Sequence, residues 1–272
     1  HQLVRFAAAG AGDQVRPVSR GTDQPTERFG NRVADYVRYR PDYPPALMAW
    51  LRRNCGVDAG QAVADIGAGT GIATRMFLEA GHPVTAVEPN GPMRDALVRD
   101  LAGFSRLRVV DGRAEATTLA DASVDVVAAA QAFHWFDPDA ARAEWRRILR
   151  PGGLAVVFWN SRRLAGSAFL EGYEALLRRY GTDYSDVAER HPDDAAMQAW
   201  FGPGLRASAA FEHHQWLDFE GLRGRLMSSS YAPQAGDARH APMLEALERL
   251  FGATATDGRV DFAYMTRVFA GT

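Results

Sequence analysis

The stretch QAVADIGAGTG at residues 61–71 decides the fold class of this chain. Val63 and Ile66 are β-branched and apolar, as expected for a strand that is buried on both faces, and Asp65 lies near the end of that strand. Glycines then occupy alternate positions, which permits a sharp turn and a close approach of the backbone to a ligand. The following segment, IATRMFLE at residues 72–79, has the apolar spacing of a helix, and a helix N-terminus attracts anions. The stretch therefore predicts a strand, a glycine turn and a helix of an α/β sheet.

A second strand with an acidic end follows this turn. Residues 83–87 form an apolar run that ends at Glu88, where a carboxylate can accept hydrogen bonds from the two hydroxyl groups of a ribose. NAD-dependent enzymes and methyltransferases both use this device. The glycine spacing is GxGxG, because Ile72 stands where a dinucleotide fingerprint has its third glycine. The pattern predicts a nucleoside-binding site and leaves the type of cofactor open.

Five segments of the chain carry a resemblance to a known family. They are RYRPDYP at residues 38–44, ADIGAGTG at 64–71, AVEPN at 86–90, QAFHWFD at 131–137 and LRPGGLAVVFWN at 149–160. In this order they resemble the class I S-adenosylmethionine-dependent methyltransferases, and most closely the small-molecule subgroup (methyltransferase type 11, trans-aconitate methyltransferase-like). The resemblance implies an α/β fold: a doubly wound, mostly parallel, seven-stranded Rossmann-like sheet with helices on both faces and a helical lid inserted after the fifth strand.

The sequence divides into four predicted parts. Residues 1–26 are rich in Ala, Gly, Gln and Arg without a sustained period, and we expect a disordered tail. Residues 27–160 are the predicted S-adenosylmethionine-binding core. Residues 161–207 are helical and aromatic in pattern and are predicted to form a lid over the substrate, although the aromatic side chains also fit a core within the insertion itself. Residues 208–272 are predicted to add strands and helices that complete the same sheet.

The resemblance implies S-adenosylmethionine as cofactor and assigns residues to it. Asp65 is expected near the methionine amino group, Glu88 on the ribose and Glu115 by the adenine. The methionine carboxylate is expected near the corner at residues 38–44, where the plain structural alternative is that tyrosines pack and an arginine caps a helix. The complete set of cofactor residues implied is Tyr36, Arg40, Asp65, Gly67, Ala68, Gly69, Glu88, Pro89, Ala114, Glu115, Gln131 and Phe133.

The acceptor side of the predicted site contains one residue that can move a proton. His134 follows the fourth predicted strand, and an imidazole with a pKa of about 6.5 can deprotonate a hydroxyl or an amine. The alternative is a histidine that only bonds to a backbone carbonyl, since a carboxylate acceptor needs no base. Residues expected to contact the substrate are Tyr39, Trp135, Trp159 and Arg162, and Arg163 and Arg225 are further candidates for an anionic substrate.

Composition excludes several functions and partners. The formal net charge of −2 gives no general attraction to nucleic acid or to anionic membranes, and no apolar run approaches the ~20 residues of a membrane span. The chain has no lysine, which excludes a pyridoxal-phosphate Schiff base and a P-loop. Its single cysteine, Cys55, cannot form an internal disulfide, and the adjacent His213 and His214 would point to opposite faces of a strand, so we expect no metal site. These features predict a cytoplasmic protein, and basic residues that are all arginine indicate a bacterial source. The resemblance implies a small molecule as partner, and we expect a monomer or a homodimer.

Three functions remain at the level of the sequence. The first is methyl transfer from S-adenosylmethionine to an oxygen, nitrogen or carbon atom of a small molecule, with a role in secondary metabolism as one setting. The second keeps the same cofactor and fold but catalyses a reaction other than methyl transfer. The third is an NAD-dependent oxidoreductase, which Ile72 disfavours.

Overall fold

The protein is built on one seven-stranded sheet. The structure is a computed structural model and describes residues 33–188 and 192–272, so the predicted tail at residues 1–26 lies outside the described residues, as does the side chain of Tyr36. The strands are β1 (Val63–Ile66), β2 (Val84–Val87), β3 (Leu107–Val110), β4 (Val124–Ala130), β5 (Leu149–Arg162), β6 (Leu205–Leu217) and β7 (Val260–Gly271). Their order is β3-β2-β1-β4-β5-β7-β6, and β7 runs antiparallel to both of its neighbours. The predicted doubly wound, mostly parallel sheet is confirmed.

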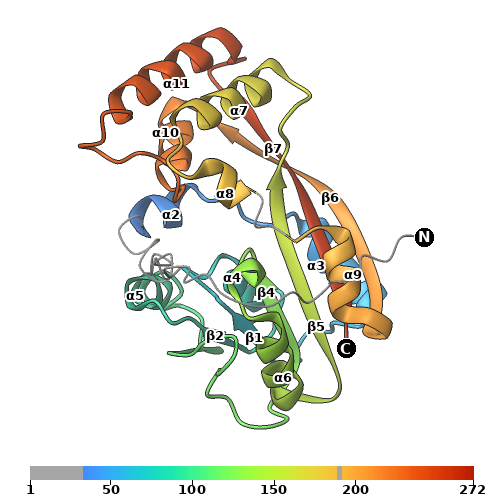
Figure 1. The fold of residues 1–272 in the computed structure, drawn as a ribbon. Helices are drawn as coiled ribbons and strands as arrows, with labels where there is room; N and C mark the ends of the chain where they lie inside the picture. The colour runs from blue at the N-terminus through green and yellow to red at the C-terminus, as the bar shows by residue number, and fades with distance from the viewer. Residues whose placement is uncertain (1–32, 189–191) are drawn as a thin grey trace, which may run out of the picture.

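Helices cover both faces of the sheet (Figure 1). They are α2 (Val33–Tyr39), α3 (Pro45–Cys55), α4 (Ile72–Glu79), α5 (Gly91–Asp100), α6 (Pro138–Ile148), α7 (Ala168–Tyr180), α8 (Tyr184–Ala188), α9 (Asp194–Phe201), α10 (Phe219–Met227) and α11 (His240–Thr254), with short 3-10 helices η1 (Phe133–Trp135) and η2 (Gly202–Gly204). Helix α4 begins and ends at the residues that the sequence predicts. Because side chains alternate along a strand, neighbouring residues of one strand serve opposite faces.

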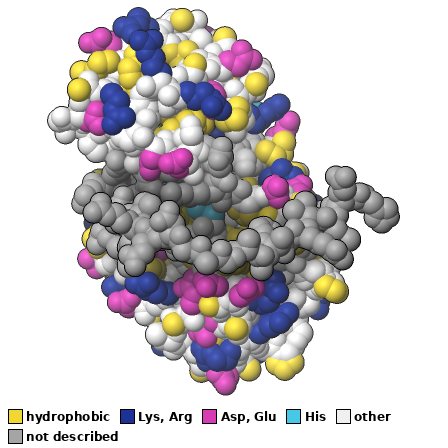
Figure 2. Space-filling view, in the orientation of Figure 1, with side chains coloured by type: hydrophobic (Ala, Val, Ile, Leu, Met, Phe, Trp, Pro, Cys, Tyr) yellow, Lys and Arg dark blue, Asp and Glu magenta, His cyan; other side chains and the backbone are white. Residues whose placement is uncertain are grey.

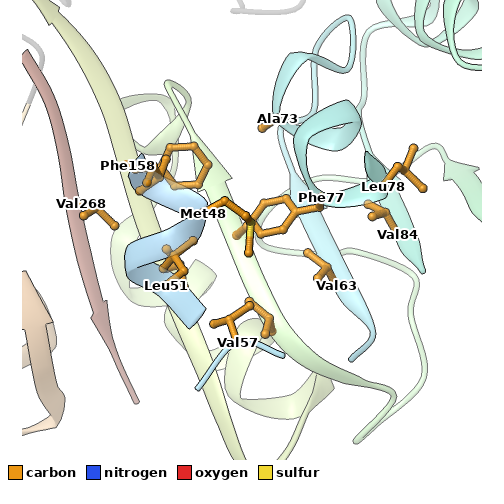
Figure 3. Packing of buried hydrophobic residues seen from close by; sticks show 14 of the residues in the cluster. Met48, Leu51, Val57, Val63, Ala73, Phe77, Leu78, Val84, Phe158 and Val268 are labelled. Carbon is orange, nitrogen blue, oxygen red and sulfur yellow. The ribbon is translucent and has the colours of Figure 1, made fainter. Parts of the chain in front are cut away.

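The two faces have separate apolar cores. Val63 and Phe158 pack with Leu51 of α3 and Phe77 of α4 on one face, where burial of these side chains is nearly complete (Figure 3). On the other face, α6 and α9 cover the alternate residues of the same strands, Ile66 among them. Burying a large apolar side chain contributes roughly 1.5–3 kcal/mol, so these two layers hold the strand ends in fixed positions.

Strands β5, β6 and β7 are longer than the others and extend beyond the parallel part of the sheet (Figure 1). A third apolar core lies there, in which Tyr173 of α7, Leu222 of α10 and Leu247 of α11 surround Phe262 of β7. We call α7, α8, α10 and α11, with the adjoining parts of β5–β7, the helical lobe. It is built from two separate stretches of sequence, before and after β6.

Candidate active site

The carboxyl ends of the parallel strands form one edge at which the predicted site lies. Ile66 of β1 pairs in register with Val87 of β2, so the glycine turn and Glu88 begin side by side. Gly67, Gly69 and Gly71 have φ values of +68°, +57° and +91°, which side-chain-bearing residues rarely adopt. The sequence Asp-Ile-Gly therefore turns sharply out of the sheet and into α4.

Two of these glycines are also needed for close packing. A Cβ at Gly67 would lie 2.8 Å from the Cβ of Ala132, and one at Gly71 would lie 2.8 Å from Cγ of Leu97 on α5. Gly71 thus serves the packing of α4 against α5, whereas Gly67 brings the backbone to the wall of the cavity described below.

Asp65 is completely buried below the glycine turn. Thr74 Oγ1 of α4 donates a hydrogen bond of 2.6 Å to Asp65 Oδ2, while Asp65 Oδ1 has no hydrogen-bond partner in the described part of the chain. Burial raises the pKa of this carboxyl to about 6, although the Thr74 hydroxyl opposes the shift. A small cavity of about 40 Å³ adjoins Asp65 and is also lined by Tyr43, Gly67 and Thr70. An unpartnered buried carboxylate oxygen beside a cavity fits the ammonium group of the cofactor's methionine part.

Glu88 is almost fully buried, and its carboxylate is held from two sides. The backbone N–H of Gly69 donates to Oε2 and the backbone N–H of Asn90 donates to Oε1, each at 2.8 Å. Burial raises the pKa of Glu88, while the two N–H donors lower it in part. A carboxylate oxygen can accept more than one hydrogen bond, so this geometry leaves acceptor capacity for the ribose hydroxyls.

The predicted adenine side lies after β3. Ala114 is buried and lines the larger cavity together with Pro89 and Glu115. Glu115 Oε1 accepts a hydrogen bond of 2.8 Å from the backbone N–H of Asp137, whose own side chain caps α6. The loop after β3 is therefore tied to the start of α6.

Gln131 directly follows β4 in a strained conformation and fixes the centre of the site. Its φ of +60° is unusual for a residue with a side chain. The Gln131 amide exchanges two hydrogen bonds with the backbone of Asn160 in β5, at 3.1 Å and 2.8 Å. The Asn160 side chain in turn donates to the Asp42 carbonyl at 2.9 Å and accepts from Thr266 Oγ1 at 2.6 Å. These contacts join β4, β5, β7 and the segment between α2 and α3.

A larger cavity of about 600 Å³ lies between this edge and the helical lobe. Of the residues predicted from the sequence, it is lined by Arg40, Gly67, Gly69, Glu88, Pro89, Ala114, Glu115, Gln131, His134, Trp135 and Arg162, while Asp65 and Ala68 line the smaller cavity. The structure therefore brings most of the predicted site into two cavities that share Gly67, Gly69 and Gln131.

Phe133 and Trp159 line neither cavity. The Phe133 ring lies 4.9 Å from the ring of Trp200, in an aromatic cluster on the α6 face. Trp159 is buried on the same face and stacks on Phe269 at 5.6 Å. The alternation along β5 directs Trp159 to that face, so its contacts are those of a core residue.

Tyr39 lies at the contact between α2 and α10 and also lines neither cavity. Its hydroxyl donates to Glu220 at 3.2 Å, and its ring packs so closely on Gly224 that a Cβ there would lie 2.0 Å from a ring carbon. Its neighbour Arg40 does line the cavity and donates to the Ser228 carbonyl at 3.2 Å. The corner thus places Arg40 at the site and uses Tyr39 to attach the helical lobe.

His134 and Trp135 come from η1 at the end of β4. Both line the larger cavity, and their rings lie 4.7 Å apart. The 3-10 turn is fixed by hydrogen bonds from the backbone N–H groups of Trp135 and Phe136 to preceding carbonyls. The imidazole of His134 is thereby held at the cavity wall between the cofactor edge and the helical lobe.

The helical lobe contributes a charged wall. Arg162 pairs with Glu174 of α7 and donates to the Tyr184 hydroxyl at 2.8 Å. Glu174 also pairs with Arg178 at 2.8 Å. Arg163, the other candidate in this segment, is half exposed and lies 3.7 Å from Glu212, away from the cavity-lining residues. Of the two, only Arg162 is at the site.

Several residues of the site are absent from the sequence-based set. They are Asn90, Arg113, Asn160, Glu174, Tyr184, Tyr231 and Tyr264, and all of them line the larger cavity. For the last strand, the available sequence signal was the pair of polar residues Tyr264 and Thr266 within its largely apolar stretch. For the residues of the helical lobe, the position in the sequence does not show which side chains face the cavity.

Metal-ligand and membrane features are absent from the described ranges. Among residues 33–188 and 192–272, no three His, Cys, Asp or Glu side chains gather as a metal site requires. His213 bonds to Asp42 and His214 pairs with Asp261, each at 3.0 Å, in keeping with opposite directions on β6. In the same ranges, no helix has the length and apolar character of a membrane span.

Comparisons with known proteins agree with this fold. A family model described as "Methyltransferase domain" matches residues 64–157. An uncharacterized methyltransferase-like protein of Schizosaccharomyces pombe is 35% identical over 248 residues, which cover 89% of this chain and 94% of that protein. An uncharacterized methyltransferase of Mycobacterium tuberculosis is 43% identical over 134 residues, 49% of this chain and 52% of that protein. The match thus spans about half the length of the mycobacterial relative.

The solved structure of a candidate type II methyltransferase from Anaeromyxobacter dehalogenans superposes with a TM-score of 0.62 and 26% sequence identity, over 86% of this chain and 97% of that chain. Fold and relatives together place the chain among the class I S-adenosylmethionine-dependent methyltransferases, as the sequence predicts. The chain belongs to the methyltransferase family.

Proposed function

We propose that this protein transfers a methyl group from S-adenosylmethionine to an oxygen, nitrogen or carbon atom of a small molecule. The observation that carries the proposal is the cavity of about 600 Å³, which joins the cofactor edge at Glu88 and Glu115 to the polar wall of the helical lobe at Arg162 and Tyr184. Its size is that of a small-molecule site. The acceptor would lie between the two walls.

The chain offers a specific place to each part of the cofactor. The unpartnered oxygen of Asp65 would take the methionine ammonium group, Arg40 the carboxylate, Glu88 the ribose hydroxyls and the Ala114–Glu115 segment the adenine. When bound, S-adenosylmethionine supplies an electrophilic methyl group on a sulfonium. The protein then has to hold the acceptor in line and exclude water, and positioning of this kind can contribute roughly 7–11 kcal/mol to lowering the barrier.

We further propose that the helices between β5 and β6 act as a lid, and that the protein works in the cytoplasm without nucleic acid, as a monomer or a homodimer. The position of Glu174 and Arg178 of α7 and Tyr184 of α8 along the larger cavity supports the lid. Mixed acidic and basic side chains on the face shown in Figure 2, together with the net charge of −2, support the absence of a nucleic-acid surface.

Calorimetric titration tests the proposal without knowledge of the acceptor. We expect S-adenosylhomocysteine to bind at micromolar concentration and NADH and NADPH not to bind. Binding of a reduced nicotinamide alone would contradict the proposal and favour an oxidoreductase. Mass analysis of turnover separates methyl transfer from other uses of the cofactor, because only methyl transfer yields S-adenosylhomocysteine and an acceptor heavier by one methylene.

His134 is the proposed general base for a hydroxyl or amine acceptor. His134→Ala is expected to lower kcat by roughly 10²–10⁴-fold, which is the usual contribution of a positioned base, and to leave the affinity for S-adenosylhomocysteine unchanged. His214→Ala is the matched control, because His214 pairs with Asp261 on β6 and does not line the cavity. Full turnover by the His134 variant would reject the base role and leave only a positioning role.

A further inference from the structure

Arg225 of α10 is a buried arginine that pairs with no carboxylate among the described residues. It is 6% exposed and lines the larger cavity from the side of the helical lobe. Its Nε donates to the Tyr264 hydroxyl at 3.0 Å and its Nη1 donates to Ser229 Oγ at 3.1 Å. Its Nη2 donates to no acceptor in the described part of the chain, where no Asp or Glu oxygen lies within 4.0 Å of the guanidinium either.

Arg162 lines the same cavity but differs from Arg225 in having an acidic partner. Arg162 also lies over a tyrosine ring, that of Tyr173 at 5.1 Å, but its charge is balanced by Glu174. Glu174 is shared with Arg178 as well. Among the described lobe residues that line the cavity, Glu174 pairs with Arg162 and Arg178, and Arg225 has no acidic partner.

The neighbours of Arg225 hold it in place without neutralising it. Its guanidinium lies 5.1 Å from the Phe262 ring centroid and 6.0 Å from that of Tyr264. The Tyr264 hydroxyl donates onward to Gln215 at 3.2 Å, so its oxygen is fixed as an acceptor for Nε. Two neutral hydrogen-bond acceptors and two aromatic faces orient the planar group. Arginine keeps its charge even when buried, so the side chain remains a preorganised cation at the cavity wall.

We infer that Arg225 selects the acceptor: it binds an anionic group, a carboxylate in the first instance, on the small molecule that is methylated. This inference rests on the proposed function, because it takes the bound anion to be the methyl acceptor. Anion binding at Arg225 itself can be measured without turnover. A guanidinium with Nη2 and part of Nη1 unused matches the two oxygens of a carboxylate. Binding a charged group there also offsets the cost of burying an unpaired cation. Arg40 donates to the carbonyl of Ser228 at the end of α10. The proposed function assigns Arg40 to the methionine carboxylate, so it is not counted as a second acceptor site.

Binding of matched acids and amides to protein saturated with S-adenosylhomocysteine tests the inference. The probes are benzoate and succinate against benzamide and succinamide, titrated by calorimetry and by the shift in melting temperature. Saturation with S-adenosylhomocysteine keeps the methionine carboxylate subsite filled. We expect the acids to bind at millimolar concentration or tighter and the amides at least tenfold more weakly. Arg225→Gln is expected to remove the difference between acid and amide.

Two further variants keep the test decisive. Arg223→Gln changes an exposed arginine of the same helix and is expected to bind acids as the wild type does. Arg225→Lys retains the positive charge and loses the paired donors, so it is expected to weaken acid binding several-fold even if the glutamine variant fails to fold. Equal binding of acids and amides, unchanged acid binding in both Arg225 variants, or no acid binding to the wild type would each overturn the inference. If the wild type does not bind S-adenosylhomocysteine, that result would instead contradict the proposed function.

Discussion

Replacing Glu88 with alanine is expected to lower the affinity for S-adenosylhomocysteine at least tenfold. The carboxylate is the acceptor proposed for the ribose hydroxyls, and hydrogen bonds to a charged group contribute about 1.5–3 kcal/mol each. The change has a second cost, because the backbone N–H groups of Gly69 and Asn90 both lose their acceptor at 2.8 Å. A buried N–H left without a partner costs about 1–3 kcal/mol, so the melting temperature of the free protein is expected to fall as well.

A second variant and a control separate the loss of cofactor affinity from the loss of stability. Glu88→Gln keeps a neutral oxygen for one backbone N–H and presents an amide to the other, so it is expected to lose cofactor affinity with the smaller change in stability. Glu79→Ala on the neighbouring helix α4 is the control, because that side chain is mostly exposed and forms a surface pair with Arg75. Calorimetry with S-adenosylhomocysteine and thermal melting are read together. Unchanged affinity in a folded Glu88→Ala protein would remove Glu88 from the cofactor site.

The part of the site that the sequence predicts is the part that local patterns determine. The turn at Gly67 and the acidic end of β2 at Glu88 each follow a short apolar strand, and parallel strands necessarily bring their carboxyl ends to one edge. That Gly67 and Glu88 lie close together therefore follows from the order and direction of their strands alone. The structure places both beside the cavity, where Gly67 and Glu88 line the same wall.

The helical lobe is less predictable because its geometry depends on contacts between distant segments. The apolar run at residues 154–159 predicts the middle of β5, whereas the strand extends to Arg162 because it pairs with β7 up to Tyr264. Trp159 looks like a substrate residue when only its position at the end of the predicted strand is considered. Whether its side chain is buried depends on the face of the sheet that α9 covers. No local sequence pattern predicts that face.

The same reasoning explains the two lobe arginines. From the sequence, Arg162 is an expected substrate residue and Arg225 a further candidate for an anionic ligand. What separates them is the presence of Glu174 beside one and of Tyr264 and Ser229 beside the other. Those partners come from α7, β7 and the turn after α10, so the distinction exists only after the lobe has folded.

Asp65 is expected to make the free protein less stable above pH 6 than a neutral side chain would. Its folded-state pKa is about 6, raised by burial from an ordinary value of 3.8. A carboxyl whose pKa is raised on folding stabilises the folded state below its unfolded pKa, and this contribution is lost as the pH rises through the folded pKa. A shift of two units corresponds to about 3 kcal/mol. Asp65→Asn is therefore expected to melt at a higher temperature than the wild type at pH 8, with the difference vanishing near pH 4.

Cofactor affinity is expected to move in the opposite direction, because the ionised carboxylate is the proposed partner of the methionine ammonium group. The wild type should bind S-adenosylhomocysteine more weakly as the pH falls below about 6, by up to tenfold per unit, since protonated Asp65 no longer attracts a cation. Asp65→Asn should bind weakly at every pH, while retaining an oxygen for the Thr74 hydroxyl. Asp95→Asn, on the exposed side of α5, is the control for removal of one negative charge. A stabilised Asp65 variant that binds as tightly as the wild type at pH 8 would mean that the buried charge is not held for the cofactor, and Asp65 would then be a structural residue of the turn.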